Sequence, residues 1–76
     1  MTSCIPEVTA KQLVSVVMKL GFRFDRQKGS HAVHIRETDN ARVVIPMHAG
    51  KDIKPKTLEA ILTDMGVTVG EFRAYL

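Results

Sequence analysis

Two stretches of apolar residues with helical spacing constrain the fold of this chain more than any other feature. In each stretch the apolar residues recur at positions i, i+3, i+4 and i+7, which places them on one side of a helix. The stretches are Leu13, Val16, Val17 and Leu20, and then Leu58, Ile61, Leu62 and Met65. A helix with one apolar side has to cover it, and we expect both stripes to form the core.

Residues that begin and end helices flank both stripes. Thr9 and Gln12 have the spacing of a capping box, in which each side chain bonds the backbone amide of the other residue. Glycine favours helix ends, and proline suits a first helical turn because no amide hydrogen is needed there. The other boundary residues are Gly21, Pro55 and Gly66, then a second capping box at Thr68 and Glu71 before a short last helix with Val69, Phe72 and Leu76.

The sequence between the two stripes alternates between apolar and polar residues, as half-buried strands do. The predicted strands are Phe22–Arg26, His31–Arg36 and Arg42–Ile45. A polar loop at Gln27–Ser30 and a turn at Thr38–Ala41 separate them. Pro46 is expected to end the third strand, because proline has no amide hydrogen to donate, and the loop Met47–Lys54 follows.

This order of elements predicts an α+β fold, α-β-β-β-α with a terminal helical turn, as a single domain over residues 1–76. A three-stranded antiparallel sheet with both main helices on one face would bury both stripes and leave its other face open. His31 shares a face with Val33 and Ile35, because side chains alternate along a strand. We expect that face to be the core face, with His31 at its rim or the strand beginning after His31.

The middle of the chain concentrates the positive charge. Eleven basic and eight acidic residues give the whole chain a net charge of +3. Residues 23–56 alone contain eight basic and four acidic residues, a net charge of +4, whereas residues 57–76 carry −2. All three histidines lie in the middle segment. Such a concentration can bind a polyanion, or it can be an ordinary solvated surface.

Several chemistries do not fit a chain of 76 residues with one cysteine. Cys4 can form neither an intrachain disulfide nor a multi-thiolate zinc site, and we expect an incidental thiol in a reducing compartment. His31 and His34 point to opposite faces of a strand, so we expect no metal site, and no cofactor motif is present. The apolar runs are too short for a membrane span and the N-terminus lacks a secretion-signal pattern, so we expect a cytoplasmic location.

RNA cleavage is a reaction that a small basic domain can catalyse, because RNA supplies its own nucleophile, the 2′-hydroxyl. The enzyme has to remove one proton, supply another and stabilise the charge that develops on the phosphate. A histidine titrates near neutral pH and can move either proton, and lysine or arginine can stabilise the charge. From residue chemistry alone, however, an ordinary polar role at the end of a loop is favoured for His31.

Three groups of short motifs occur in a specific order and spacing. They are Leu20-Gly21-Phe22 with Arg26-Gln27-Lys28-Gly29-Ser30-His31, then Val44-Ile45-Pro46-Met47-His48, then Ile53-Lys54-Pro55-Lys56-Thr57-Leu58 with Ile61-Leu62, Met65-Gly66-Val67 and Glu71-Phe72. Together they resemble the HicA toxin family, small ribonucleases of bacterial and archaeal toxin–antitoxin modules. The resemblance runs from about Ile5 to the C-terminus, and Arg26–His31 is its most specific motif.

The resemblance implies a fold like that of a double-stranded-RNA-binding domain, in agreement with the predicted order of elements. It implies a metal-independent endoribonuclease that acts on mRNA with one essential histidine, which maps onto His31. Gly29 and Ser30 would shape the turn that presents it. His48 matches a family position and could hold the loop, contact RNA or assist catalysis. The implied partner is a HicB-type antitoxin, which would cover the basic surface around His31 and could build a dimer or higher assembly.

The chain departs from the family pattern at two positions. Ala32 follows the Gly-Ser-His motif, where many members have a second histidine or another ring. Lys56 stands where the family commonly has glycine. Neither change removes the essential histidine, but Ala32 leaves His48 as the main candidate for a second proton-transfer group.

Five basic residues of the middle segment are candidate phosphate contacts. They are Arg26, Lys28, Lys51, Lys54 and Lys56. Two other functions stay open from the sequence. A non-catalytic RNA-binding module would use the same fold and charges without a titrating group. An interaction protein would use its basic face only to bind an acidic partner.

Overall fold

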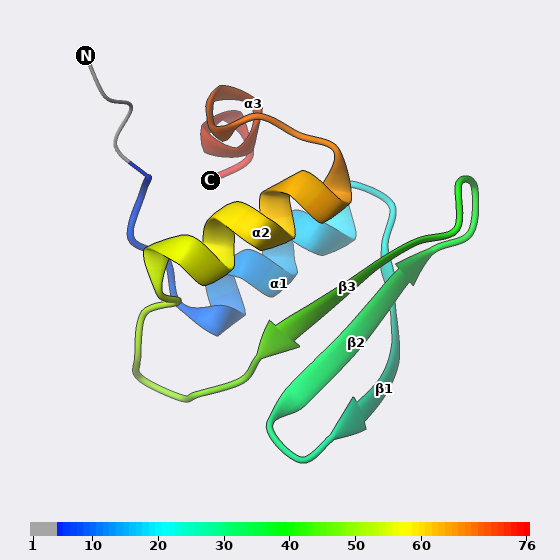
Figure 1. Ribbon diagram of the computed structural model, residues 1–76, viewed down its shortest axis with the longest axis horizontal. Coiled ribbons are helices and arrows are strands. Elements are labelled where there is room, and N and C mark those ends of the chain that lie inside the picture. The colour runs from blue at the N-terminus through cyan, green and yellow to red at the C-terminus, as the bar shows by residue number, and fades with distance from the viewer. Residues whose placement is uncertain (1–4) are drawn as a thin grey trace.

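The computed structural model describes residues 5–76 and has two layers (Figure 1). The elements are α1 (Ala10–Lys19), β1 (Arg23–Lys28), β2 (His31–Arg36), β3 (Ala41–Pro46), α2 (Pro55–Met65) and α3 (Val69–Ala74). The strands form one antiparallel sheet in the order β1-β2-β3, with α1 and α2 on one face. This arrangement confirms the predicted α+β, double-stranded-RNA-binding-domain-like fold. Cys4, for which we expected an incidental thiol, lies outside the described residues.

Both predicted capping boxes are present. The amide of Gln12 donates to the Thr9 hydroxyl at 3.2 Å, and the amide of Thr9 donates to Gln12 Oε1 at 2.8 Å. Thr68 and Glu71 repeat the pattern at 3.1 and 2.8 Å. Gly66 ends α2 with φ 75°, in the left-handed region that other residues rarely adopt. The starts of α1 and α3 therefore follow from local hydrogen bonding, and the end of α2 follows from backbone conformation.

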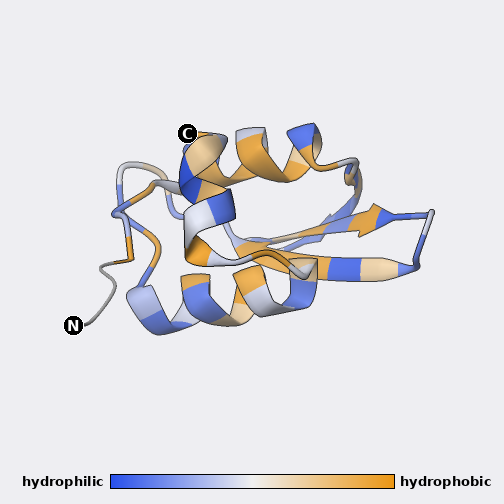
Figure 2. Ribbon diagram, turned by 90° about the horizontal axis from the view of Figure 1, so that it is seen from above, coloured by the Kyte–Doolittle hydropathy of each residue, from blue (hydrophilic) through white to orange (hydrophobic). Residues whose placement is uncertain are grey.

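The apolar stripes of α1 and α2 pack on the sheet, mainly through β3. The buried stripe residues are Leu13, Val16 and Val17 on α1, and Leu58, Ile61, Leu62 and Met65 on α2. Figure 2 shows hydrophobic bands of both helices turned toward the interior. α3 adds the buried Phe72, whereas Leu20 is only partly buried. Leu76, predicted to share the stripe of the last helix, is 55% exposed because it lies beyond the end of α3.

The register of the sheet shows which face of β2 packs on the helices. Ala32 pairs with Ile45, and His34 pairs with Val43. Directly paired residues of antiparallel strands point to the same face. Because Val43 and Ile45 belong to the hydrophobic core, Ala32 and His34 also face the helices.

The prediction that His31, Val33 and Ile35 lie on the core face is therefore wrong. These three residues occupy the open face, and β2 begins at His31 itself. The prediction failed because β2 carries apolar residues on both faces, so that hydropathy alone does not distinguish them. His31 therefore does not lie at the rim of the core.

β1 is longer than predicted, because Gln27 and Lys28 belong to the strand and not to the following loop. A bulge between Phe24 and Arg26 shifts the register and interrupts the alternation of apolar and polar residues. β1 is also an edge strand, and even Phe24 is half exposed. The polar residues Gln27 and Lys28 therefore do not show where β1 ends.

Pro46 lies within β3, although we predicted that it would end the strand. The amide of Met47 donates to the carbonyl of Ser30 at 2.6 Å, and hydrogen-bonded pairs alternate along an antiparallel ladder. The pair His31–Pro46 is thus a non-hydrogen-bonded one, and the backbone of Pro46 points to the free edge. Its missing amide hydrogen costs the sheet nothing.

Across residues 5–76, no helix is both long and apolar enough to cross a membrane.

Candidate functional site

A two-residue turn places His31 at the start of β2. Lys28 and His31 pair across it, and Gly29 and Ser30 form its tip. Gly29 has φ 58°, whereas Ser30 is not among the described non-glycine residues with positive φ, a combination typical of a type II′ hairpin turn. A Cβ at Gly29 would meet nothing within 4 Å, so glycine is required by backbone conformation and not by space. The His31 side chain is exposed.

Basic residues of β1 share the open face with His31. The register pairs Lys28 with His31 and Arg26 with Val33, which places both basic side chains on that face. Arg26 Nη1 bonds the neighbouring carboxylate of Asp25 at 3.0 Å, so part of its charge is already neutralised. Within residues 5–76 no ion pair involves Lys28.

The loop between β3 and α2 is fixed at both ends. Met47 is bonded to Ser30 at one end, and at the other the amide of Ile53 donates to the carbonyl of Val8 at 2.8 Å. Between them the amide of Lys51 donates to the carbonyl of His48 at 3.2 Å, closing a turn. Since Pro46 pairs with His31, His48 lies two residues beyond the strand end that carries His31. The fold therefore brings the two candidate histidines to the same end of the sheet.

A groove that we call the lysine groove opens at this end of the sheet, with a volume of about 380 Å³. Its lining includes Pro46, His48, Lys51, Asp52 and Lys54. Three of the predicted site residues, one histidine and two lysines, are thus brought together. Because Pro46 is the direct cross-strand neighbour of His31, the groove adjoins the open face of the sheet. Lys56 is exposed in the first turn of α2 and does not line the groove.

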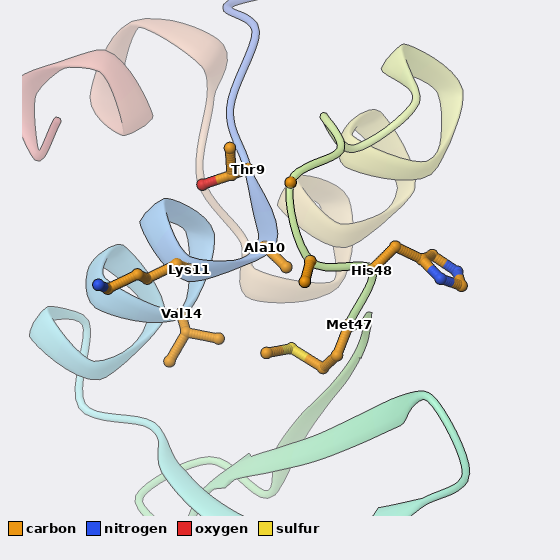
Figure 3. A pocket seen from close by; sticks show the side chains of 8 residues that line it. Thr9, Ala10, Lys11, Val14, Met47 and His48 are labelled. Atoms are coloured by element: carbon orange, nitrogen blue, oxygen red, sulfur yellow. The ribbon is translucent and has the colours of Figure 1, made fainter.

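A second cavity, of about 570 Å³, lies between the start of α1 and the same loop, and we call it the apolar pocket. Ala10, Val14 and Met47 contribute apolar walls, and His48 and Ala49 lie on its loop side. In Figure 3 the side chains of Ala10, Val14 and Met47 converge, whereas the imidazole of His48 points away from them. This pocket was not predicted from the sequence. The one indication of the pocket in the sequence is Val14, an apolar residue outside the α1 stripe.

Arg36, one of the basic residues of the middle segment, is used inside the fold. Its guanidinium donates to the carbonyls of Leu20 and Met65, both at 3.1 Å, at the ends of α1 and α2. It also makes two bonds to the Asp39 carboxylate at 3.0 and 2.8 Å and lies 4.6 Å from the centre of the Phe22 ring. The carboxylate raises the pKa of Arg36. Arg36 ties both helices to the β2–β3 hairpin and is not free to bind a polyanion.

His34 lies in the core and not in the candidate site. It is 2% exposed, its ring meets Phe24 edge-on at 5.7 Å, and its Nδ1 has no hydrogen-bond partner within the described chain. Burial lowers its pKa, so the neutral ring is favoured. No group of three histidine, cysteine, aspartate or glutamate side chains within residues 5–76 could hold a metal ion.

A comparison with families of known proteins gives a match over residues 10–67. The matching family is described as the HicA toxin of bacterial toxin-antitoxin systems. The matched region runs from the start of α1 to just beyond α2 and includes the β1–β2 turn, both candidate histidines and the lysine groove. A search of curated proteins gives no significant match.

Proposed function

Because the chain belongs to the HicA toxin family of toxin–antitoxin modules, we propose that this toxin is a metal-independent endoribonuclease that cleaves mRNA and is neutralised by a HicB-type antitoxin. One observation carries the proposal. His31 is exposed directly after a tight turn, and its cross-strand neighbour Pro46 lines the lysine groove. A proton-transfer group beside a cationic groove is what metal-free cleavage of RNA requires.

The proposed reaction uses the 2′-hydroxyl of the RNA as the nucleophile. Its oxygen forms a bond to the neighbouring phosphorus as the bond from phosphorus to the 5′-oxygen breaks. The products are a 2′,3′-cyclic phosphate and a 5′-hydroxyl, so one proton leaves the 2′-hydroxyl and one joins the 5′-oxygen. His31 performs one of these transfers, and Gly29 and Ser30 position it through the turn.

The second proton and the developing charge require further groups. His48 is the main candidate for the second transfer, because Ala32 offers no second ring beside His31 and His48 lies at the same end of the sheet. Lys51 and Lys54 of the lysine groove would stabilise the charged phosphate. Lys28 and Arg26 on the open face, and Lys56 at the start of α2, would extend the track for the RNA backbone.

The open face of the sheet supports the proposed antitoxin. Val44 is 39% exposed in the middle of β3, whereas its cross-strand neighbour Val33 is buried, so the apolar side chain of Val44 lies uncovered between basic residues such as Arg26 and Arg42. A HicB-type partner that covers this face would bury the apolar surface and block His31 together. Neutralisation would then need no change in the shape of the toxin.

The decisive experiment expresses the protein without an antitoxin. We expect growth arrest and degradation of mRNA, and we expect His31→Ala to abolish both. Circular dichroism of the purified variant should show an unchanged fold, because the His31 side chain is exposed and makes no hydrogen bond within residues 5–76. Full toxicity of a folded His31→Ala variant would show that His31 is not the essential histidine.

Purified protein separates this proposal from the alternatives. We expect it to shorten RNA with time and to do so equally well in EDTA, because no metal takes part. Loss of cleavage in EDTA would contradict the metal-free mechanism. Binding without cleavage would identify a non-catalytic RNA-binding module, and absence of binding even at low salt would identify an interaction protein.

A further inference from the structure

Cleavage by a 2′-hydroxyl imposes a conformation on the RNA. The attacking oxygen, the phosphorus and the departing 5′-oxygen have to lie in line, and a nucleotide stacked in a regular helix does not present them so. Proteins that act on single-stranded RNA commonly splay bases out of the stack and hold them against the protein. If the proposed function holds, this toxin needs a place for one unstacked base beside its phosphate site.

The apolar pocket lies where such a base would go. It shares His48 with the lysine groove, so that one residue separates a cationic groove from an apolar cavity. It also lies beside the β1–β2 turn that presents His31, because Met47 lines the pocket and its amide donates to the carbonyl of Ser30 at 2.6 Å. A nucleotide has this same division, a charged phosphate beside a flat base with apolar faces.

We infer that the apolar pocket holds the unstacked base of the nucleotide at the cleavage site, while Lys51 and Lys54 hold the adjoining phosphates. The inference rests on the proposed function. The charges around the pocket favour a nucleic acid as the occupant. Lys11 lines the pocket itself and two lysines line the adjoining groove, against a single acidic residue, Asp52.

The walls of the pocket determine what it can recognise. Its polar lining residues are Thr9, Lys11 and His48. The Thr9 hydroxyl is already engaged, since it accepts from the Gln12 amide at 3.2 Å and donates to Gln12 Oε1 at 3.3 Å. In Figure 3 the side chains of Lys11 and His48 point away from the apolar walls. The side chains of Ala10, Val14 and Met47, which form the apolar walls, offer no donor or acceptor to read the edge of a base. The pocket therefore selects by apolar contact area and favours the larger purine bases over pyrimidines without a strict sequence rule.

The experiment places a larger side chain in the apolar pocket. Ala49 is exposed on the loop side, so Ala49→Leu adds bulk there without disturbing the core. Ala60→Leu makes the same change on the exposed side of α2 and is the matched control. The probe is a 2′-O-methyl RNA oligonucleotide that contains one 2-aminopurine between adenines, because this RNA lacks the nucleophile and the fluorescence of 2-aminopurine rises when it unstacks.

We expect the wild-type protein and Ala60→Leu to raise the 2-aminopurine fluorescence on binding, and Ala49→Leu to lose the rise. On cleavable RNA, Ala49→Leu should reduce cleavage beside purines by about tenfold relative to pyrimidines, in the range that small changes of an apolar pocket produce. Val14→Phe fills the pocket from the α1 side and should repeat the result, with a thermal melt of each variant as the check on folding.

Two outcomes would overturn the inference while the proposed function stands. One is normal cleavage by the wild-type protein with no fluorescence change and no difference between Ala49→Leu and Ala60→Leu. The other is unchanged RNA cleavage by Ala49→Leu with loss of neutralisation by a co-expressed antitoxin, which would make the pocket a site for that protein. Absence of any cleavage by the wild-type protein would instead refute the proposed function.

Discussion

His31 and His34 lie three positions apart in β2 and have opposite environments. His31 is exposed on the open face at the tight turn, whereas His34 is buried beneath the helices and paired with Phe24 on the edge strand. The alternation of a strand predicts that they point to opposite faces. It does not say which face is covered, because Val33 on the open face is as apolar as Ala32 on the covered one.

The buried His34 makes the stability of the protein depend on pH. Below about pH 6.5 the unfolded chain takes up a proton on this ring, whereas the folded chain, in which burial lowers its pKa, does not. The free energy of unfolding should therefore fall as the pH decreases from 6.5 toward the folded pKa. Urea denaturation at pH 7.5 and 5.5 should show this decrease for the wild-type protein and a smaller one for His34→Leu.

His31→Gln is the control, because it removes an exposed histidine and keeps the buried His34 in place. A full decrease in His34→Leu would assign the effect to other groups. The paired carboxyls are not the explanation, because Arg23 and Arg36 lower the pKa values of Glu37 and Asp39 below their ordinary 4.5 and 3.8. These two contributions are lost only at more acidic pH.

The helices could be predicted more completely than the strands or the cavities. The helix boundaries depend on the capping bonds of Thr9 and Thr68 and on the backbone preferences of Pro55 and Gly66. All of these act within a few residues, so their spacing in the sequence is sufficient. The length of β1 depends on a bulge and on its place at the edge of the sheet, which are properties of pairing between distant segments. The apolar pocket is likewise made where α1 meets the loop 47–50, and no local pattern describes that meeting.

The links between elements also depend on a residue whose role the sequence did not indicate. Arg36 belongs to the basic middle segment, yet its guanidinium bonds the carbonyls that end α1 and α2. We expect Arg36→Lys to lower the free energy of unfolding by about 1–3 kcal/mol, since an ammonium cannot reach both carbonyls and the carboxylate of Asp39 together. Denaturant titration followed by circular dichroism measures the change.

Arg23→Lys provides the comparison for Arg36→Lys. Arg23 pairs with Glu37 at 2.8 Å, but both side chains are largely exposed, and such pairs contribute little. The midpoint of denaturation of the Arg23→Lys variant should therefore equal that of the wild-type protein. Equal effects of the two substitutions would mean that the bonds of Arg36 to the helix ends do not stabilise the fold.

Acidic and basic residues lie on different parts of the molecule, as they do along the sequence. The acidic residues Glu59 and Asp64 lie on the exposed side of α2, opposite its buried stripe, and Glu71 lies in the last helix. The lysines of the loop before α2 and Lys28 of β1 lie at the end of the sheet that carries His31. The proposed reaction needs only this surface, because the substrate supplies the nucleophile.

The salt dependence of RNA binding tests whether the lysine groove holds the RNA backbone. Each phosphate contact on a single strand contributes about 0.7 to the slope of log affinity against log salt concentration. Lys51→Gln and Lys54→Gln should each weaken binding and reduce the slope by about that amount. Lys19→Gln removes the same charge from the last turn of α1, where Lys19 Nζ bonds the carbonyl of Tyr75, and should leave the slope unchanged. If all three variants reduce the slope equally, the RNA responds to the net charge of the protein and not to the groove, and the phosphate contacts assigned to Lys51 and Lys54 are wrong.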